Sequence, residues 1–200
     1  MSRAACASAL EAIEGHFRRL RAPVLDYLAP GLTDAEMDAL TEPHGFLLPD
    51  DVRAWWAWHN GVLQGGRTPV HPGRCRLTIQ FGGPMASLGQ ALADRVKWLE
   101  AEQQHGADDM LPLWTPTWLQ LTTFQDSWAV DMGDDYAGSR VFAASTHAGY
   151  PRLADTLQEL LERWLGFLDS GLIVWRPDSG SWEFSPDAPA GAIRQALGGL

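Results

Sequence analysis

The chain of 200 residues is poor in lysine and cysteine and has no long, uncharged apolar run. Lys97 is the single lysine, and the other fourteen basic residues are arginines. Cys6 and Cys75 are isolated thiols, a pattern typical of neither a metal cluster nor a disulfide-rich secreted scaffold. No stretch approaches the roughly eighteen apolar residues of a membrane span. Ser8 and Glu11 interrupt the N-terminus, which makes it a poor signal peptide. We therefore expect a cytoplasmic protein.

Positive charge is also scarce, because 25 acidic residues outnumber 15 basic ones and give a net charge of −10. A nucleic-acid-binding surface needs a basic patch for phosphates, and an anionic membrane attracts basic residues. The composition therefore argues against nucleic acid and membrane as partners. Apolar residues at 46% and charged residues at 20% are ordinary globular proportions, and this length suits one domain that needs no disulfide or metal.

Motifs of catalytic and cofactor-binding sites are missing as well. The chain has no glycine-rich phosphate loop, no His-Glu-x-x-His pair, no Gly-x-Ser-x-Gly elbow and no Cys-x-x-Cys. Asp131, Asp134 and Asp135 are close in sequence, but an EF-hand-like loop needs a ligand where Gly133 stands, so a solvated acidic turn is the favoured interpretation. Cys75 lies on the apolar face of a predicted strand, which is typical of a core residue. We expect no enzyme, no cofactor and no metal.

Local patterns predict helices alternating with short strands. Apolar spacing and capping residues (Thr33 with Glu36, Ser87 with Gln90) predict helices at 10–20, 33–40, 49–59, 87–99 and 153–168, and a weak one near 193–197. Strand patterns occur at 75–81, 118–124, 127–132, 139–144, 172–175 and 182–184. Tight turns join the three strands between 118 and 144 into an antiparallel meander. The order predicts an α+β fold, a single domain with a largely antiparallel sheet flanked by helices.

The stretch 47–61 is the most distinctive part of the sequence. Pro49 suits the first position of a helix, where its missing N–H costs nothing, and two aspartates follow where the helix dipole favours negative charge. Asn60 and Gly61 tolerate left-handed geometry and should end the helix. Helical spacing gives it one apolar face, made of Val52, Trp55, Trp56 and His59.

This stretch resembles the helix motif of the SUKH superfamily, the Smi/Knr family of cell-wall regulators and toxin-immunity proteins. Residues 111–113 resemble the apolar–proline approach to the family's central strands, and 130–132 its strand ending in aspartate. The resemblance covers about 32–175 and implies one SUKH-like domain over 1–200, with the N-terminal helix and the C-terminal hairpin and helix as extensions. Residues 114–117 depart from it, because the family often has a glycine-rich turn there. The motif residues are Leu48, Pro49, Trp55, Trp56, Asn60 and Gly61.

The resemblance implies non-catalytic protein binding. Bacterial members are largely immunity proteins that bind and neutralise a cognate polymorphic toxin, often a nuclease. Fungal members act as interaction proteins in cell-wall regulation. An immunity protein is therefore the expected function, and a regulatory scaffold is the alternative. Independently of the family, a small-molecule binder with a tryptophan-lined cleft is a third hypothesis.

The segment 98–139 contains no lysine or arginine and carries eight carboxylates. If its loops share a face, they form an acidic field that attracts a basic partner such as a nuclease toxin. The alternative is that acidic turns keep the protein soluble. The ten tryptophans likewise either fill the core or form an aromatic binding surface. The candidate partner-binding residues are Asp108, Asp109, Asp126, Trp128, Asp131, Asp134, Asp135 and Tyr136.

Overall fold

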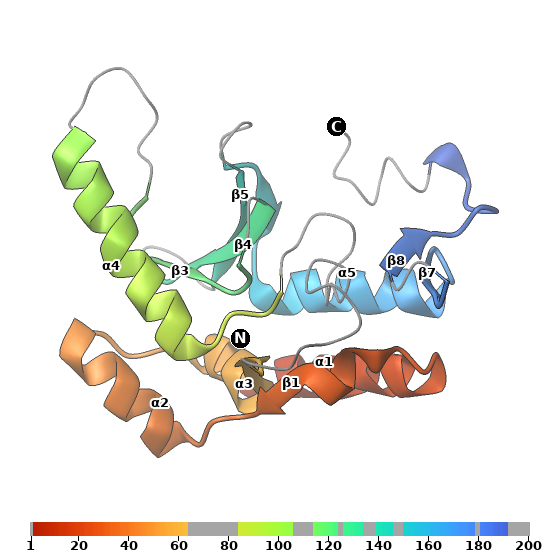
Figure 1. Ribbon diagram of the computed structural model, residues 1–200, viewed down its shortest axis with the longest axis horizontal. Coiled ribbons are helices and arrows are strands. Elements are labelled where there is room, and N and C mark those ends of the chain that lie inside the picture. Colours follow the sequence, from red (N-terminus) through yellow and green to blue (C-terminus); the bar gives the residue numbers. More distant parts are fainter. Residues whose placement is uncertain are drawn as a thin grey trace.

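The fold combines α-helices with short antiparallel strands (Figure 1). The computed structural model describes residues 2–63, 84–105, 114–123, 126–133, 139–145, 150–178 and 181–191. Within these residues the helices are α1 (Arg3–Arg19), α2 (Asp34–Thr41), α3 (Asp50–Trp58), α4 (Leu88–His105) and α5 (Leu157–Asp169), with 3₁₀ turns η1 (Pro23–Tyr27) and η2 (Glu42–His44). The strands are β1 (Leu28–Pro30), β2 (His59–Val62), β3 (Trp118–Gln120), β4 (Asp126–Asp131), β5 (Arg140–Ser145), β6 (Arg152–Ala154), β7 (Ile173–Arg176) and β8 (Ser181–Phe184). The predicted α+β class is confirmed.

The described strands form three antiparallel sheets, β1–β2, β3–β4–β5–β6 and β7–β8, where the sequence predicts one main sheet. The predicted meander is confirmed in β3, β4 and β5, and the terminal hairpin in β7 and β8. Strand β6 includes Leu153, which the sequence pattern assigns to the following helix. That helix begins only at Leu157, because the Thr156 hydroxyl accepts the Glu159 N–H at 3.0 Å and caps it.

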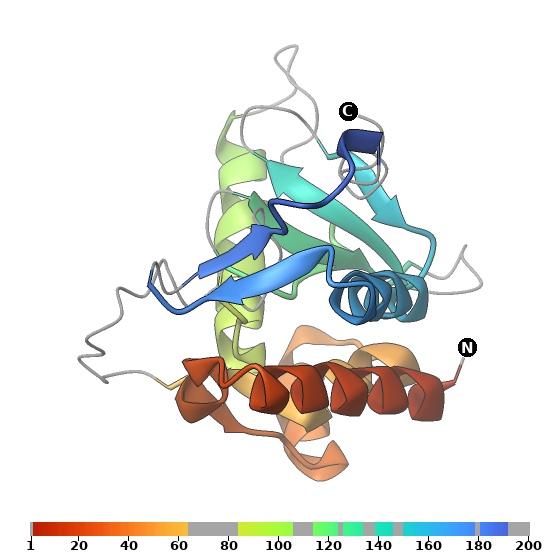
Figure 2. The same cartoon turned by 90° about the vertical axis from the view of Figure 1, so that its right-hand side faces the viewer.

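The main core lies where the N-terminal helices meet the sheet and α5. Figure 2 shows the N-terminal helices below, the four-stranded sheet above them and α4 standing along one side. Phe17 of α1 packs its ring 5.8 Å from Trp164 of α5 and 5.2 Å from Trp182 of β8. Trp164 also meets Trp128 of β4 edge to face at 6.1 Å. Aromatic contacts thus join both ends of the chain to the sheet.

Helix α1 and the terminal hairpin, predicted as extensions of the family-like region, both contribute side chains to this hydrophobic core. Cys6, Leu10, Ile13 and Phe17 lie on one face of α1 and are fully buried in the same cluster as the sheet residues. The apolar stripe of α1 requires a partner surface, and the main core supplies it.

The capping predictions have two different outcomes. The box at α2 is confirmed, since Thr33 Oγ1 accepts the Glu36 N–H at 3.3 Å and Glu36 Oε2 accepts the Thr33 N–H at 2.8 Å. The Thr33 N–H and the Thr33 hydroxyl both donate to the Glu36 carboxylate, and these two bonds lower the pKa of that carboxyl. At α4 only half of the predicted box forms. Ser87 accepts the Gln90 N–H at 3.1 Å, but the Gln90 amide donates to Asp94 instead of returning to the cap.

The motif helix α3 ends at Trp58, and Asn60 and Gly61 belong to strand β2, which corrects their prediction as a helix ending. Asn60 Oδ1 accepts the Leu88 N–H at 2.9 Å and so caps the first turn of α4. Gly61 has φ +81°, and a Cβ there would lie 2.4 Å from the backbone nitrogen of Ser87. The Asn-Gly pair therefore holds β2 against the start of α4, Asn60 by a hydrogen bond and Gly61 by a close backbone contact.

The predicted strand at 75–81 and the predicted weak helix near 193–197 lie outside the described residues. In the described part of the chain, no helix has the length and apolar character needed to cross a membrane.

We expect Gly61→Ala to destabilise the protein by about 3 kcal/mol or more, because left-handed strain and a backbone clash add together. Urea unfolding measures the change. Gly45→Ala is the matched control, since Gly45 has φ +73° but nothing within 4 Å of its added Cβ. It should cost only about 1–2 kcal/mol. Equal losses for both variants would contradict the close approach at Gly61.

Candidate functional site

Most of the predicted acidic surface lies outside the described residues. This holds for Asp108, Asp109, Asp134, Asp135 and Tyr136. Asp126 is the first residue of strand β4, and its backbone pairs with that of Ser145 in β5. The part these residues play in binding stays a prediction.

Trp128 and Asp131 are buried, which corrects their prediction as partner contacts. Trp128 is 5% exposed and packs in the main core. Asp131 is 8% exposed, and its Oδ1 accepts the Thr117 hydroxyl at 2.6 Å and the Gly133 N–H at 3.0 Å. Both faces of β4 are covered, because a second aromatic cluster packs over Ala129 on the face opposite Trp128. An acidic side chain at a strand end serves here to fix loop geometry.

The tryptophans mostly fill the core, as one of the two interpretations predicts. Eight of the ten are less than 9% exposed, and only Trp58 and Trp98 are half-buried. In the motif helix, Trp55 and Trp56 are fully buried together with Leu48, and Pro49 stands at the N-cap. The Trp56 indole donates to the Ala86 carbonyl at 3.1 Å. The motif helix is an anchor within the fold.

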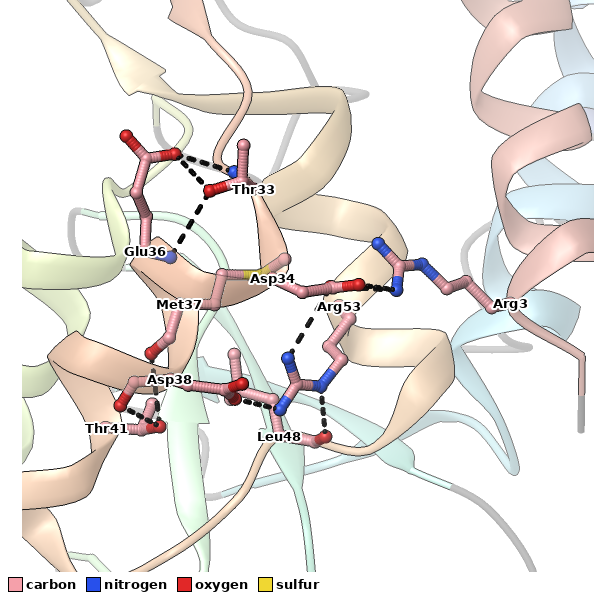
Figure 3. Close-up of polar contacts among 9 residues, drawn as sticks. All are labelled: Arg3, Thr33, Asp34, Glu36, Met37, Asp38, Thr41, Leu48 and Arg53. Atoms are coloured by element: carbon pink, nitrogen blue, oxygen red, sulfur yellow. Dashed lines mark hydrogen bonds and ion pairs between the residues drawn. The ribbon is translucent and has the colours of Figure 1, made fainter.

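Helix α2 is held in place by a buried arginine from the motif helix (Figure 3). Arg53 is 9% exposed, and its Nε donates to the Leu48 carbonyl at 3.0 Å. Its guanidinium also pairs with Asp38 and lies 3.5 Å from Asp34. Arg3 binds Asp34 at 2.8 Å from the other side, and this hydrogen bond lowers the pKa of the Asp34 carboxyl. One network thus ties α2 to α1 and α3.

An open groove of about 1060 Å³ lies beside α2. Its floor is the segment 44–47, which begins at the last residue of η2 and ends in Leu47, a residue that is 73% exposed. One wall is the face of α2 and η2 that carries Ala35, Asp38, Ala39 and Glu42. The opposite wall is formed by Arg95, Pro116, Thr117, Met132 and Gly133.

Arg95 of α4 lines one side of the groove and makes three contacts there. Its Nε and Nη2 donate to the Pro116 carbonyl at 2.9 and 2.6 Å. Its Cζ lies 5.1 Å from the ring centre of Phe46, a cation–π contact. The arginine therefore fixes the loop before β3 and the groove floor relative to α4.

Sequence reasoning missed this groove. Leu47 and Leu48 are adjacent, and the family motif attracts attention to Leu48, which is buried, rather than to the exposed Leu47. No local signal separates the two residues, because both precede the helix that begins at Asp50. Arg95 gave no local signal, because its partners are distant in sequence.

The remaining candidates for chemistry in the described segments are metal-ligating side chains and the Cys6 thiol. They contain no group of three or more histidine, cysteine, aspartate or glutamate side chains that could hold a metal. Cys6 is fully buried on α1, and burial, with smaller effects of Asp51 and Glu162, raises the pKa of its thiol to about 11. A thiol in that state is an inert core group. Cys75 lies outside the described residues.

The comparisons with known proteins add no relationship. No protein-family description matches the chain, and no curated protein matches it.

We expect Arg53→Met to lower the free energy of unfolding by about 1–2 kcal/mol, because the Leu48 carbonyl and the α2 carboxylates lose their shared donor. Urea unfolding measures the loss, and hydrogen exchange should show faster exchange of α2 amides. Arg18→Met is the control, since the Arg18 side chain is 70% exposed and pairs only along its own helix with Glu14. Its effect should stay within about 0.5 kcal/mol. Unchanged exchange in α2 would contradict the anchoring role of Arg53.

We expect Cys6 to resist thiol reagents in the folded protein. With a pKa of about 11, roughly one thousandth of it is thiolate at pH 8, and the side chain is buried. The Cys75→Ser variant isolates this thiol. Its native form should label only as fast as it unfolds, and one equivalent should label at once in urea. Rapid labelling of the native form at pH 8 would contradict the burial of Cys6.

Proposed function

We propose that this protein is a non-catalytic, SUKH-type protein-binding domain, and that it is an immunity protein which binds and neutralises a basic toxin domain. The observation that carries the proposal is the segment 98–139, which has eight carboxylates and no lysine or arginine. A nuclease toxin is a fitting partner because its own surface must be basic to hold phosphates. A cytoplasmic location, where such a toxin meets nucleic acid, is part of the proposal.

The described part of this segment supports the proposal by its rigidity. Strands β3 and β4 pair in register from Trp118 opposite Asp131 to Gln120 opposite Ala129, and β4 continues onto β5. Asp134 and Asp135 fall between β4 and β5 in the sequence. Paired strands are already ordered, so the described part of the segment adds little conformational-entropy cost to association. Trp128 and Asp131 are buried, so the predicted contacts that remain are Asp108, Asp109, Asp126, Asp134, Asp135 and Tyr136.

The proposal is tested with the toxin domain encoded beside this protein. Co-expression should rescue the growth of cells that produce the toxin, and isothermal titration should give a defined complex of the two purified proteins. Binding without rescue would favour the regulatory-scaffold alternative. Absence of both binding and rescue would refute the immunity function.

Charge reversal should act on the rate of association. We expect Asp134→Lys combined with Asp135→Lys to slow toxin association about tenfold at low salt and to weaken its salt dependence. Asp178→Lys combined with Asp187→Lys is the control, because it makes the same change of net charge at two exposed positions of the C-terminal region. Stopped-flow association at two salt concentrations measures both effects. Equal slowing by both pairs would show that net charge, and not the β4–β5 connection, governs association.

A further inference from the structure

The groove beside α2 has the features of a protein-docking surface. It is partly open to solvent, whereas sites for small molecules enclose most of the ligand surface. Leu47 is 73% exposed at its floor, and an apolar side chain so exposed gains from being covered. Ala35 and Ala39, one helical turn apart, line the wall of α2. Their small side chains leave room for a partner chain to approach the helix closely.

The charges around the groove favour a basic occupant. The segment from Asp34 to His44 carries four carboxylates and no lysine or arginine. Two of these residues, Asp38 and Glu42, line the groove. The side chain of Asp38 is 49% exposed although it pairs with Arg53. The two carboxylates outnumber Arg95, whose Nε and Nη2 donate to the Pro116 carbonyl and whose face packs on Phe46.

The groove is also supported on both sides by fixed elements. Arg53 fixes α2, and Arg95 fixes the opposite wall, so neither wall has to be ordered when a partner binds. Residues 116–117 and 132–133 of that opposite wall belong to the segment that lacks basic residues. Figure 1 shows α2 and α4 at the same end of the molecule, and the two helices are in contact.

We infer that this groove docks a basic segment of a partner protein, which places an aliphatic side chain against Leu47 and a lysine or arginine beside Glu42 and Asp38. This inference deepens the proposed function and rests on it only for the identity of the partner. The surface and its chemistry follow from the groove itself.

The first test uses peptides of defined chemistry with the full-length protein. The probes are a fluorescein-labelled peptide of alternating lysine and leucine, its glutamate–leucine analogue and its lysine–alanine analogue. Fluorescence anisotropy should show binding of the lysine–leucine peptide and at least about fivefold weaker binding of both analogues. Amide chemical shifts should change at Leu47, Arg95 and Gly133. Equal binding of the glutamate peptide, no binding at millimolar concentration, or shifts confined to other surfaces would overturn the inference.

Matched variants locate the site. Leu47→Ser and Glu42→Lys should each weaken binding of the lysine–leucine peptide by about five- to tenfold. Leu63→Ser is the control for the first, because Leu63 is 51% exposed and does not line the groove. Glu11→Lys on the exposed face of α1 is the control for the second. Both controls should stay within about twofold of the original protein. Equal effects of variants and controls would remove the groove from the interface.

The toxin domain then separates this inference from the proposed function. If Leu47→Ser weakens toxin binding as it weakens peptide binding, both stand. If the toxin binds and is neutralised but is insensitive to Leu47→Ser, the groove inference falls and the immunity function stands. If the peptide binds in the groove and the neighbouring toxin is not bound, the immunity function falls and the docking groove stands.

Discussion

The short backbone segment 84–88 holds the two halves of the fold together, because it is bonded on both sides. Toward the motif helix, the Ala86 carbonyl accepts the Trp56 indole at 3.1 Å, and the Leu88 N–H reaches Asn60 Oδ1 at 2.9 Å. Toward the sheet, the Ala86 N–H donates to the Leu121 carbonyl at 3.0 Å. Ala86 is 1% exposed, so water does not reach its backbone N–H and carbonyl. A shift of the segment that broke these hydrogen bonds would leave the buried groups without partners, which is costly. The close approach of Gly61 is the steric counterpart of these bonds.

This joint explains why a groove exists at all. It fixes the start of α4, and α4 then carries Arg95 to the loop before β3. On the other side, α2 is attached to the N-terminal helices through Arg53 rather than through a broad apolar face, since only Met37 and Thr41 of α2 are buried. The two walls thus belong to different layers of the fold. A hollow remains between them because a short helix with so few buried residues cannot fill it.

Local patterns predicted the elements whose stability is local. The Thr33 capping box, the apolar stripe of α5 and the meander all depend on residues close in sequence, and all three form. Strand β1 and the capping role of Asn60 depend on partners about thirty residues away, which no local pattern reveals. The same limit applies to the site. The carboxylates of 98–139 could be counted from the sequence, but the sequence did not reveal that Asp131 is buried and fixes a loop.

Charge and shape would act at different stages of recognition. Carboxylates far from the contact raise the association rate through long-range attraction, which salt screens. A buried aliphatic contact at Leu47 acts over short distances and therefore sets how long the complex lasts. Four residues of the groove wall come from the acidic segment 98–139. The same segment therefore supplies both negative charge for attraction and part of the groove surface. An immunity protein needs both properties, because it must reach its toxin before the toxin reaches its substrate and must then remain bound.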